Sequence, residues 1–522
     1  MVVATRFTDG HLVGTELSAR ALLDGELLGL HTTSAGWPEG VMLRPLLWPV
    51  VLLSLLIGSV AALNLTWALT PLLGAAGGWV LARVLGASPW GAVLTGALLA
   101  WTPWVRLTLA NGQIEQATLG LIALVWAAAV WGERGHRART LLSPALLLGS
   151  GLAAPHTALA ASLGLGALGV CRGWRGAWAR WAVVLGLGMA AMGVCHAYHA
   201  QNFADEANLF RPRHTLVAPD PGQRQNTVTG WHATHTSQLS YATPEALMVP
   251  IGPGAYELPT QHSPYLGGVV MLAGLGGLLL GWRRTWPLGV AAVALVGFSM
   301  APRVSVAGQD FLMPGWLLEA ISPAAQRSAS GYRLAMGAIV ALAAAAGAGL
   351  FPTGRTRRVP LVVVGLWALA WLETSLLPGH PLPLTAYPAV AHPELAVLGE
   401  VSGPVLDLPL PLHWDCQRRP PHYLNAALVH PLPFLHNVDH GAYFFGNQDA
   451  VLALNRVLES PDCAQGVKPA LQALGLGAVV LHHDLPCAAS EILETCLQDG
   501  LGDPQTSEWL SWWVLPAGGS GR

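Results

Sequence analysis

The chain has 522 residues, of which 52% are hydrophobic and only 11% are charged. Soluble domains are about 25% charged, so this composition excludes an ordinary soluble protein and indicates a membrane protein. The formal net charge of -2 excludes a globally basic chain, and we expect no nucleic-acid partner.

The amino-terminal segment is polar and precedes every apolar run that is long enough to span a membrane. Residues 1–44 include Asp9 and Glu16 and show no basic, apolar signal sequence. The next run, 45–57, is shorter than the roughly 17 to 25 residues of a span, which predicts an interfacial or re-entrant helix. The alternative is that 45–60 is a short true span.

Longer apolar runs follow, each close to the length that crosses a bilayer. The region 141–170 is interrupted by Pro155-His156 and fits either one long kinked helix or two short spans. The other runs are 62–82, 90–108, 114–131, 176–197, 265–281, 286–302, 333–351 and 359–377.

Clusters of arginine mark the ends of spans that we expect to be cytoplasmic. The clusters at 134–139 and 172–180 require an even number of crossings between them, so 141–170 is interpreted as two short spans. Further clusters at 283–284 and 355–358 then place the long polar loop 198–264 outside. The loop 303–332 and the chain from 378 onward follow it to the outside.

Counting backward from the first cluster also places residues 1–44 outside if 45–57 does not cross. An external segment of this kind normally follows a first transmembrane helix. Two alternatives follow as expectations: the natural protein has such a helix upstream of Met1, or the chain has lost it, which would favour an inactive scaffold.

The sequence predicts a mainly α protein. Residues 1–60 form a first external loop with the short apolar helix, and 61–377 form a polytopic transmembrane helical bundle of roughly ten spans. Residues 378–522 form a small soluble α/β domain, in which strand-like and helical segments alternate. The strand-like segments are 404–410, 477–481 and 512–516, and the helical ones are 447–460, 466–475 and 488–498.

Four of the six cysteines fall in this last domain. On an oxidising face they can form two disulfides in three connectivities, between which the sequence does not choose. They are Cys416, Cys463, Cys487 and Cys496, whereas Cys171 and Cys195 are interpreted as small apolar residues at span edges.

Short motifs follow one another along the whole chain in a distinctive order. They are Phe7-Thr8-Asp9-Gly10, Trp37-Pro38-Glu39-Gly40, Asn111-Gly112-Gln113-Ile114-Glu115-Gln116, Tyr265-Leu266-Gly267, Arg327 with Tyr332-Arg333, and Val405-Leu406-Asp407-Leu408-Pro409. Together they resemble the glycosyltransferase C (GT-C) superfamily, and in particular bacterial members with an extracytoplasmic C-terminal domain.

The resemblance implies a membrane enzyme that transfers a sugar from a polyprenyl-phosphate donor to an unknown glycan, lipid or protein acceptor. It implies the extracytoplasmic side of the bacterial cytoplasmic (inner) membrane as the place of reaction. No organic cofactor is implied, although some members of the superfamily use a divalent cation. Histidine pairs such as His232 and His235 lack a four-ligand pattern, and we expect no metal site.

Such a transfer needs a carboxylate near the acceptor to take its proton. In the superfamily this carboxylate lies in the first external loop, and Asp9 occupies that place; helix capping is its structural alternative. Glu115 is the second carboxylate candidate, at the outer end of a span, where Asn111 as a cap and Glu115 in the first turn are the structural alternative. Glu16 lies about two helical turns beyond Asp9 and is a weaker candidate.

The leaving phosphate needs cations on the same side, and arginine suits bidentate phosphate contact. Arg106, Arg213 and Arg333 meet this condition by topology. Their alternative is to reach toward lipid headgroups.

Two other classes of function stay open. A polysaccharide or lipid transporter component needs broken helices with polar groups at the midplane, whereas the spans here are mostly Leu, Ala, Val and Gly. A catalytically inactive membrane scaffold is the other alternative.

Overall fold

The computed structural model describes the residues that follow, and all structural statements refer to them. They are 2–3, 15, 19, 23, 30–31, 41–42, 48–110, 117–133, 140–173, 178–204, 265–300, 303–306, 309–321, 331–354, 359–376, 386–387, 393–401, 405–408, 453–454, 456–483 and 489–515. The chain divides into two compact units, which are described separately: 65–384 is the helical unit, and 1–64 with 385–522 is the sheet unit.

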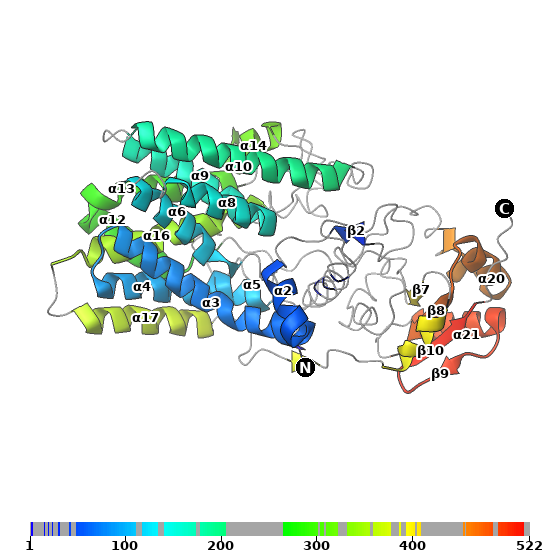
Figure 1. Cartoon of the computed structure of the whole chain (residues 1–522). Coiled ribbons are helices and arrows are strands. Elements are labelled where there is room, and N and C mark those ends of the chain that lie inside the picture. The colour runs from blue at the N-terminus through cyan, green and yellow to red at the C-terminus, as the bar shows by residue number, and fades with distance from the viewer. Residues whose placement is uncertain are drawn as a thin grey trace. The chain divides into compact units, whose positions relative to one another are not determined.

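The helical unit is a bundle of apolar helices, drawn from blue to yellow-green in Figure 1. Its helices are α3 (Ser59–Val84), whose first residues belong to the other unit, α4 (Pro89–Ala100), α5 (Pro103–Ala110), α6 (Leu119–Glu133), α8 (Leu142–Ala153), α9 (Pro155–Arg172), α10 (Trp178–Ala204), α12 (Gly268–Leu280), α13 (Trp282–Ser299), α14 (Gly315–Ile321), the 3₁₀ helix η7 (Gly331–Leu334), α16 (Ala335–Leu350) and α17 (Val359–Leu376). A hairpin of β4 (Arg303–Val306) and β5 (Gln309–Leu312) lies between α13 and α14 in the chain.

The positions of two helix breaks follow from prolines. The region 141–170 forms two helices, as the arginine count predicts, and α9 begins with Pro155 at its first position. The run 90–108, which the sequence analysis names as one apolar run of spanning length, contains two helices, α4 and α5, with a break at Trp101 and Thr102. A residue before proline disfavours the helical conformation, and Thr102 caps the new helix by accepting the Val105 amide at 3.0 Å.

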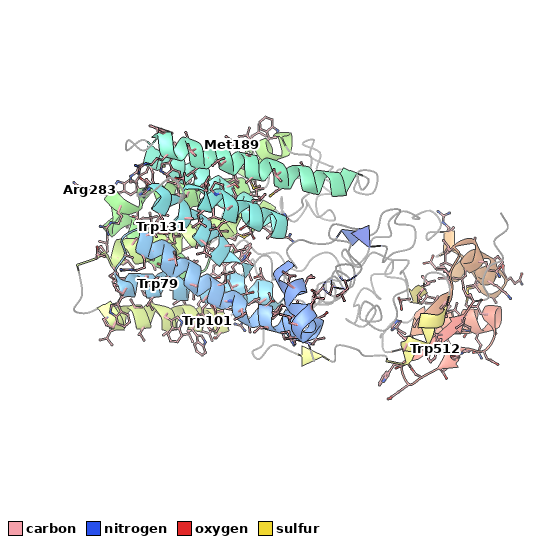
Figure 2. All side chains as sticks on the ribbon, in the orientation of Figure 1. Trp79, Trp101, Trp131, Met189, Arg283 and Trp512 are labelled. Atoms are coloured by element: carbon pink, nitrogen blue, oxygen red, sulfur yellow. A yellow bond between two sulfur atoms is a disulfide. The ribbon has the colours of Figure 1, made fainter. Side chains whose placement is uncertain are left out.

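Within the described part of the chain, three helices are long and apolar enough to cross a bilayer: Ser59–Val84, Pro89–Leu109 (α4 and α5 taken together) and Trp178–Cys195. The sequence predicts roughly ten spans, and the described helices fulfil this prediction only in part when they are judged by length and hydropathy. The remaining apolar helices are shorter: Leu119–Glu133, Leu142–Gly151, Gly268–Leu280, Ala335–Leu350 and Pro360–Leu376. Large apolar side chains such as Trp79, Trp131 and Met189 are exposed on the outer faces of this unit (Figure 2), as lipid contact requires.

Helix α16 is the centre of the helical unit. Its residues from Ala335 to Gly349 are all buried, and α4, α12 and α13 pack around it. The helix is made almost entirely of Ala, Gly and other small or aliphatic residues, which allows neighbouring backbones to approach closely. Packing of small residues therefore holds the bundle together.

The described elements of the sheet unit come from both ends of the chain. β1 (Val2–Val3) pairs with β6 (Ala386–Tyr387), and β2 (Leu30–His31) pairs with β3 (Val41–Met42). The other elements are α2 (Trp48–Ile57), the 3₁₀ helix η8 (Pro393–Glu400), β7 (Val405–Leu408), α20 (Cys463–Ala473), β8 (Ala478–His482), α21 (Ala489–Leu501), β9 (Gln505–Thr506) and β10 (Leu510–Val514).

The C-terminal sheet has the strand order β7-β8-β10-β9. β7 and β8 are parallel and the other pairs are antiparallel, so the α/β pattern predicted from the sequence is present in the described residues. Because side chains alternate along a strand, each face has its own core, one with Leu406 and Leu481 and the other with Val405 and Val480.

Two pairs of side chains connect elements of this small domain: a disulfide and a buried Asp–His pair. Cys463 of α20 and Cys496 of α21 form a disulfide with a Cα–Cα distance of 5.6 Å, which selects one of the pairings that the sequence left open. Cys416 and Cys487 lie outside the described residues. On adjacent strands, Asp407 and His482 are both buried and their Oδ1 and Nε2 atoms are 3.0 Å apart.

Candidate active site

The directions of the helices define two ends of the helical unit. Thr95 of α4 bonds the carbonyl of Ala343 at 3.1 Å and Gly91 lies against Gly347, so α4 runs antiparallel to α16. Gly277 lies against Ala345, and four residues further along Gly281 lies against Gly349, so α12 runs parallel to α16. α12 and α16 therefore begin at the same end.

At the opposite end, basic residues close the turns between helices. The Arg83 guanidinium donates to the Ala87 carbonyl at 2.8 Å, and Arg284 donates to the Gly86 carbonyl at 3.1 Å. Gly86 has a φ of 87°, a conformation that favours glycine. We call this the arginine end.

The same end includes an ion pair between α6 and α9. The Nε atom of Arg172 lies 2.6 Å from Glu133 Oε2, and Arg180 at the start of α10 donates to the Glu133 carbonyl. The described arginines of the clusters 172–180 and 283–284, which the sequence analysis assigns to one side of the membrane, share this end, and Arg83 lies there too.

The other end, which we call the loop end, is where α9, α12 and α16 begin and α17 ends. Helices α5 and α10 also end there. A guanidinium lies at this end on η7: an Nη atom of Arg333 lies 3.4 Å from Nδ1 of His156. His156 is the second residue of α9, and both side chains are partly buried.

The residue that follows His156 belongs to a pair of buried hydroxyl groups. Thr157, next to His156, has its Oγ1 atom 3.1 Å from Oγ1 of Thr118, just before α6. The Thr157 hydroxyl also lies 3.8 Å from the sulfur of Met336, the second residue of α16. Both threonines are buried, so polar groups from three helices meet inside an apolar unit. A guanidinium, an imidazole and hydroxyls are groups that bind a phosphate.

A second arginine, Arg106, lies on α5. The α5 residues around it, Trp104, Val105 and Leu107, are at most 3% exposed, and Arg106 itself is partly buried. Since α5 follows the end of α4, and α4 runs antiparallel to α16, α5 lies at the loop end. An ionisable side chain among such neighbours is costly and is most often functional.

A carboxylate that the sequence analysis did not select also lies at this end. Glu373 of α17 accepts hydrogen bonds from the Tyr265 hydroxyl, from the Gly268 amide at 2.6 Å and from the Val269 amide at 3.1 Å. The signal in the sequence was a single glutamate inside the apolar run 359–377. Its partner Tyr265 opens one of the motifs cited above.

Two of the predicted site residues are described by the structure and four are not. Arg333 and Arg106 both lie at the loop end. Asp9, Glu16, Glu115 and Arg213 lie outside the described residues. His156, Thr118, Thr157 and Glu373 are polar residues of the loop end that the sequence analysis missed.

No family profile and no curated protein sequence matches the chain. The fold, however, is similar to that of several solved structures. The mycobacterial arabinofuranosyltransferase AftD is 16% identical with a TM-score of 0.56, and the alignment covers 99% of this chain and 38% of AftD. The fold is GT-C-like.

Two further structures complete the comparison. A mutant form of AftD is 16% identical with a TM-score of 0.52, over 99% of this chain and 40% of that one. ArnT from Cupriavidus metallidurans is 14% identical with a TM-score of 0.49, over 98% of this chain and 93% of ArnT. The chain spans well under half the length of AftD.

Proposed function

We propose that the chain is a membrane glycosyltransferase that takes a sugar from a polyprenyl-phosphate donor at its loop end. The observation that carries this proposal is the contact of Arg333 with His156 at that end, on a GT-C-like fold. The proposal places the loop end on the extracytoplasmic side of the bacterial cytoplasmic membrane. The arginine end then obeys the positive-inside rule.

The proposed reaction is a displacement at the anomeric carbon of the sugar. The bond from this carbon to the phosphate oxygen breaks, and its electron pair leaves with the phosphate. The acceptor oxygen forms the new bond, and its proton passes to a carboxylate. Asp9 is the proposed proton acceptor, and Glu115 and then Glu16 are the alternatives.

Cations stabilise the charge that builds up on the leaving phosphate. Arg333 is the proposed principal ligand, with His156 beside it. Arg106 and Arg213 are proposed as further ligands. A divalent cation is not required by this assignment, and among the described residues no cluster of three His, Cys, Asp or Glu side chains is suited to hold one.

Binding of the lipid phosphate is the first test, because it needs no knowledge of the sugar. The full chain in phosphatidylcholine nanodiscs is titrated with undecaprenyl phosphate, and the wild type is expected to bind it. Arg333→Gln is expected to weaken binding about 10- to 100-fold, the usual effect of losing a hydrogen bond to a charged group. Arg284→Gln at the arginine end is the matched control and should bind like wild type.

Turnover is the second test. Release of undecaprenyl phosphate from a panel of undecaprenyl-phosphate sugars is followed by mass spectrometry, starting with arabinofuranose because AftD is an arabinofuranosyltransferase. Asp9→Asn is expected to abolish release while leaving lipid binding intact. A wild type that binds no lipid phosphate and releases none from any donor contradicts the proposed function and favours a scaffold.

A further inference from the structure

Glu373 is a carboxylate on an otherwise apolar helix, and the proposed reaction does not use it. Its neighbours on α17 face outward: Trp371, Leu372 and Leu376 are 47%, 45% and 72% exposed. Glu373 is partly buried, and its side chain turns to α12 instead. An acidic residue in such a position needs a compensating interaction to be tolerated.

The compensation is a helix cap supplied by another helix. The residue at the N-cap of α12 is Gly267, which has no side chain to accept the first amides. Both Glu373 oxygens fill this role, one for the Gly268 amide at 2.6 Å and the other for the Val269 amide at 3.1 Å. A negative charge at this position also interacts favourably with the helix dipole.

Tyr265 extends the cap to α5. Its hydroxyl donates to Glu373 and accepts the Gly268 amide at 3.0 Å, while the residue forms a buried apolar contact with Leu107 of α5. Gly267, with a φ of 90°, lies so near α5 that a Cβ atom there would be 3.1 Å from Cδ of Pro103.

The residue after Glu373 makes a second connection to the same place. The hydroxyl of Thr374 donates to the carbonyl of Trp101 at 2.9 Å, in the turn from which α5 begins. Consecutive residues of α17 therefore hold both the turn before α5 and the start of α12, where Tyr265 and Gly267 lie against α5. α5 is the helix that carries Arg106.

We propose that Glu373 is a positioning residue that, through Tyr265 and together with Thr374, holds α5 so that Arg106 faces the lipid phosphate. The identity of the ligand in this proposal rests on the proposed function. The connection from Glu373 through Tyr265 to α5, which we call the brace, rests only on the described contacts. Glu373 does not bind the phosphate, because two anions repel each other. Its effect on binding passes through α5.

The test combines a structural and a binding measurement on the full chain in nanodiscs. Hydrogen exchange is measured on peptides that cover Pro103–Ala110 and the start of α12, and undecaprenyl phosphate is titrated as the probe. Glu373→Ala is expected to speed exchange in both peptides and to weaken binding about tenfold. Glu373→Gln keeps one oxygen acceptor and is expected to be intermediate in both measurements. Tyr265→Phe keeps the ring and removes the hydroxyl, and it too is expected to be intermediate.

Glu133→Gln is the matched control, because it makes the same substitution in a paired glutamate at the arginine end. It is expected to leave exchange in α5 and binding of the lipid phosphate unchanged. Faster exchange at the start of α12 alone, with α5 and binding unaffected, overturns the positioning role.

The two proposals fail in different ways. If the wild type binds no undecaprenyl phosphate but Glu373→Ala still speeds exchange in α5, the brace stands and the proposed function fails. If the wild type binds and Glu373→Ala binds equally well, the proposed function stands and the positioning role fails.

Discussion

Gly277 in the contact between α12 and α16 provides the sharpest quantitative prediction. A Cβ atom at this position would lie 2.1 Å from the Ala345 carbonyl oxygen and 2.5 Å from its carbon. A normal carbon–oxygen contact is about 3.3 Å or longer. Because backbone atoms cannot turn aside, Gly277→Ala requires the two helices to separate by about 1 Å.

The neighbouring Gly276 is the matched control on the same helix. The nearest atom to a Cβ there is Cδ2 of Leu350, at an ordinary 3.5 Å. Gly276→Ala is therefore expected to change stability only through helix propensity, a gain of about 0.5 to 1 kcal/mol. Gly277→Ala has the same gain but also overpacks the contact against backbone atoms, at about 2 to 3 kcal/mol, which leaves a net loss of about 1 to 2.5 kcal/mol.

Unfolding of the full chain in detergent, followed by tryptophan fluorescence at one fixed scan rate, measures the difference. The two variants should move the midpoint in opposite directions. Equal midpoints for Gly276→Ala and Gly277→Ala would refute the close approach of α12 and α16. Glu373 caps the start of α12, and α16 begins directly after Arg333. The geometry of the loop end therefore depends on the contact between these two helices.

Three further predictions concern stability. Reduction of the Cys463–Cys496 disulfide should destabilise the C-terminal sheet by about 2 to 4 kcal/mol, which denaturant titration with and without reductant measures. Asp407→Ala leaves buried His482 without its carboxylate and should cost about 3 to 5 kcal/mol, whereas replacing both by Leu should be nearly neutral in the same titration. Ser88→Ala removes the side chain that caps α4 and should cost about 1 kcal/mol in thermal unfolding.

Much of the fold could be predicted from the sequence because its determinants are local. The apolar run 359–377 corresponds to α17 at Val359–Leu376, and the run 265–281 corresponds to α12 at Gly268–Leu280. The arginine clusters predicted which helix ends lie on the same side of the bundle, because the positions of charges along the chain can be read directly from the sequence.

The break between α4 and α5 was visible in principle as Pro103, but composition outweighed it. Arg106 is the only charged residue of the run 90–108, and hydropathy does not register a local change of backbone conformation. The sequence analysis therefore identified the run of spanning length but not the break within it, which places Arg106 on a separate short helix.

The site was harder to predict because its contacts join residues that are far apart in the chain. Arg333 was selected as a cation on the correct side, but His156 was treated only as part of an interruption. Their contact depends on the packing of α9 against α13 and η7, which no local pattern encodes. Glu373 was missed for the same reason, since its partners lie more than a hundred residues earlier.

The electrostatics of the loop end favour Arg333 over the start of α12 as the place for an anion. α9, α12 and α16 all begin there, and each helix start carries a partial positive charge. At α12 the carboxylate of Glu373 already occupies this position. At α9 and α16 the described polar contacts are instead those of Arg333 with His156 and of the neighbouring Thr157. For the proposed lipid phosphate, the start of α12 is therefore unfavourable and the starts of α9 and α16 are favourable, which is why Arg333 is the residue to mutate first.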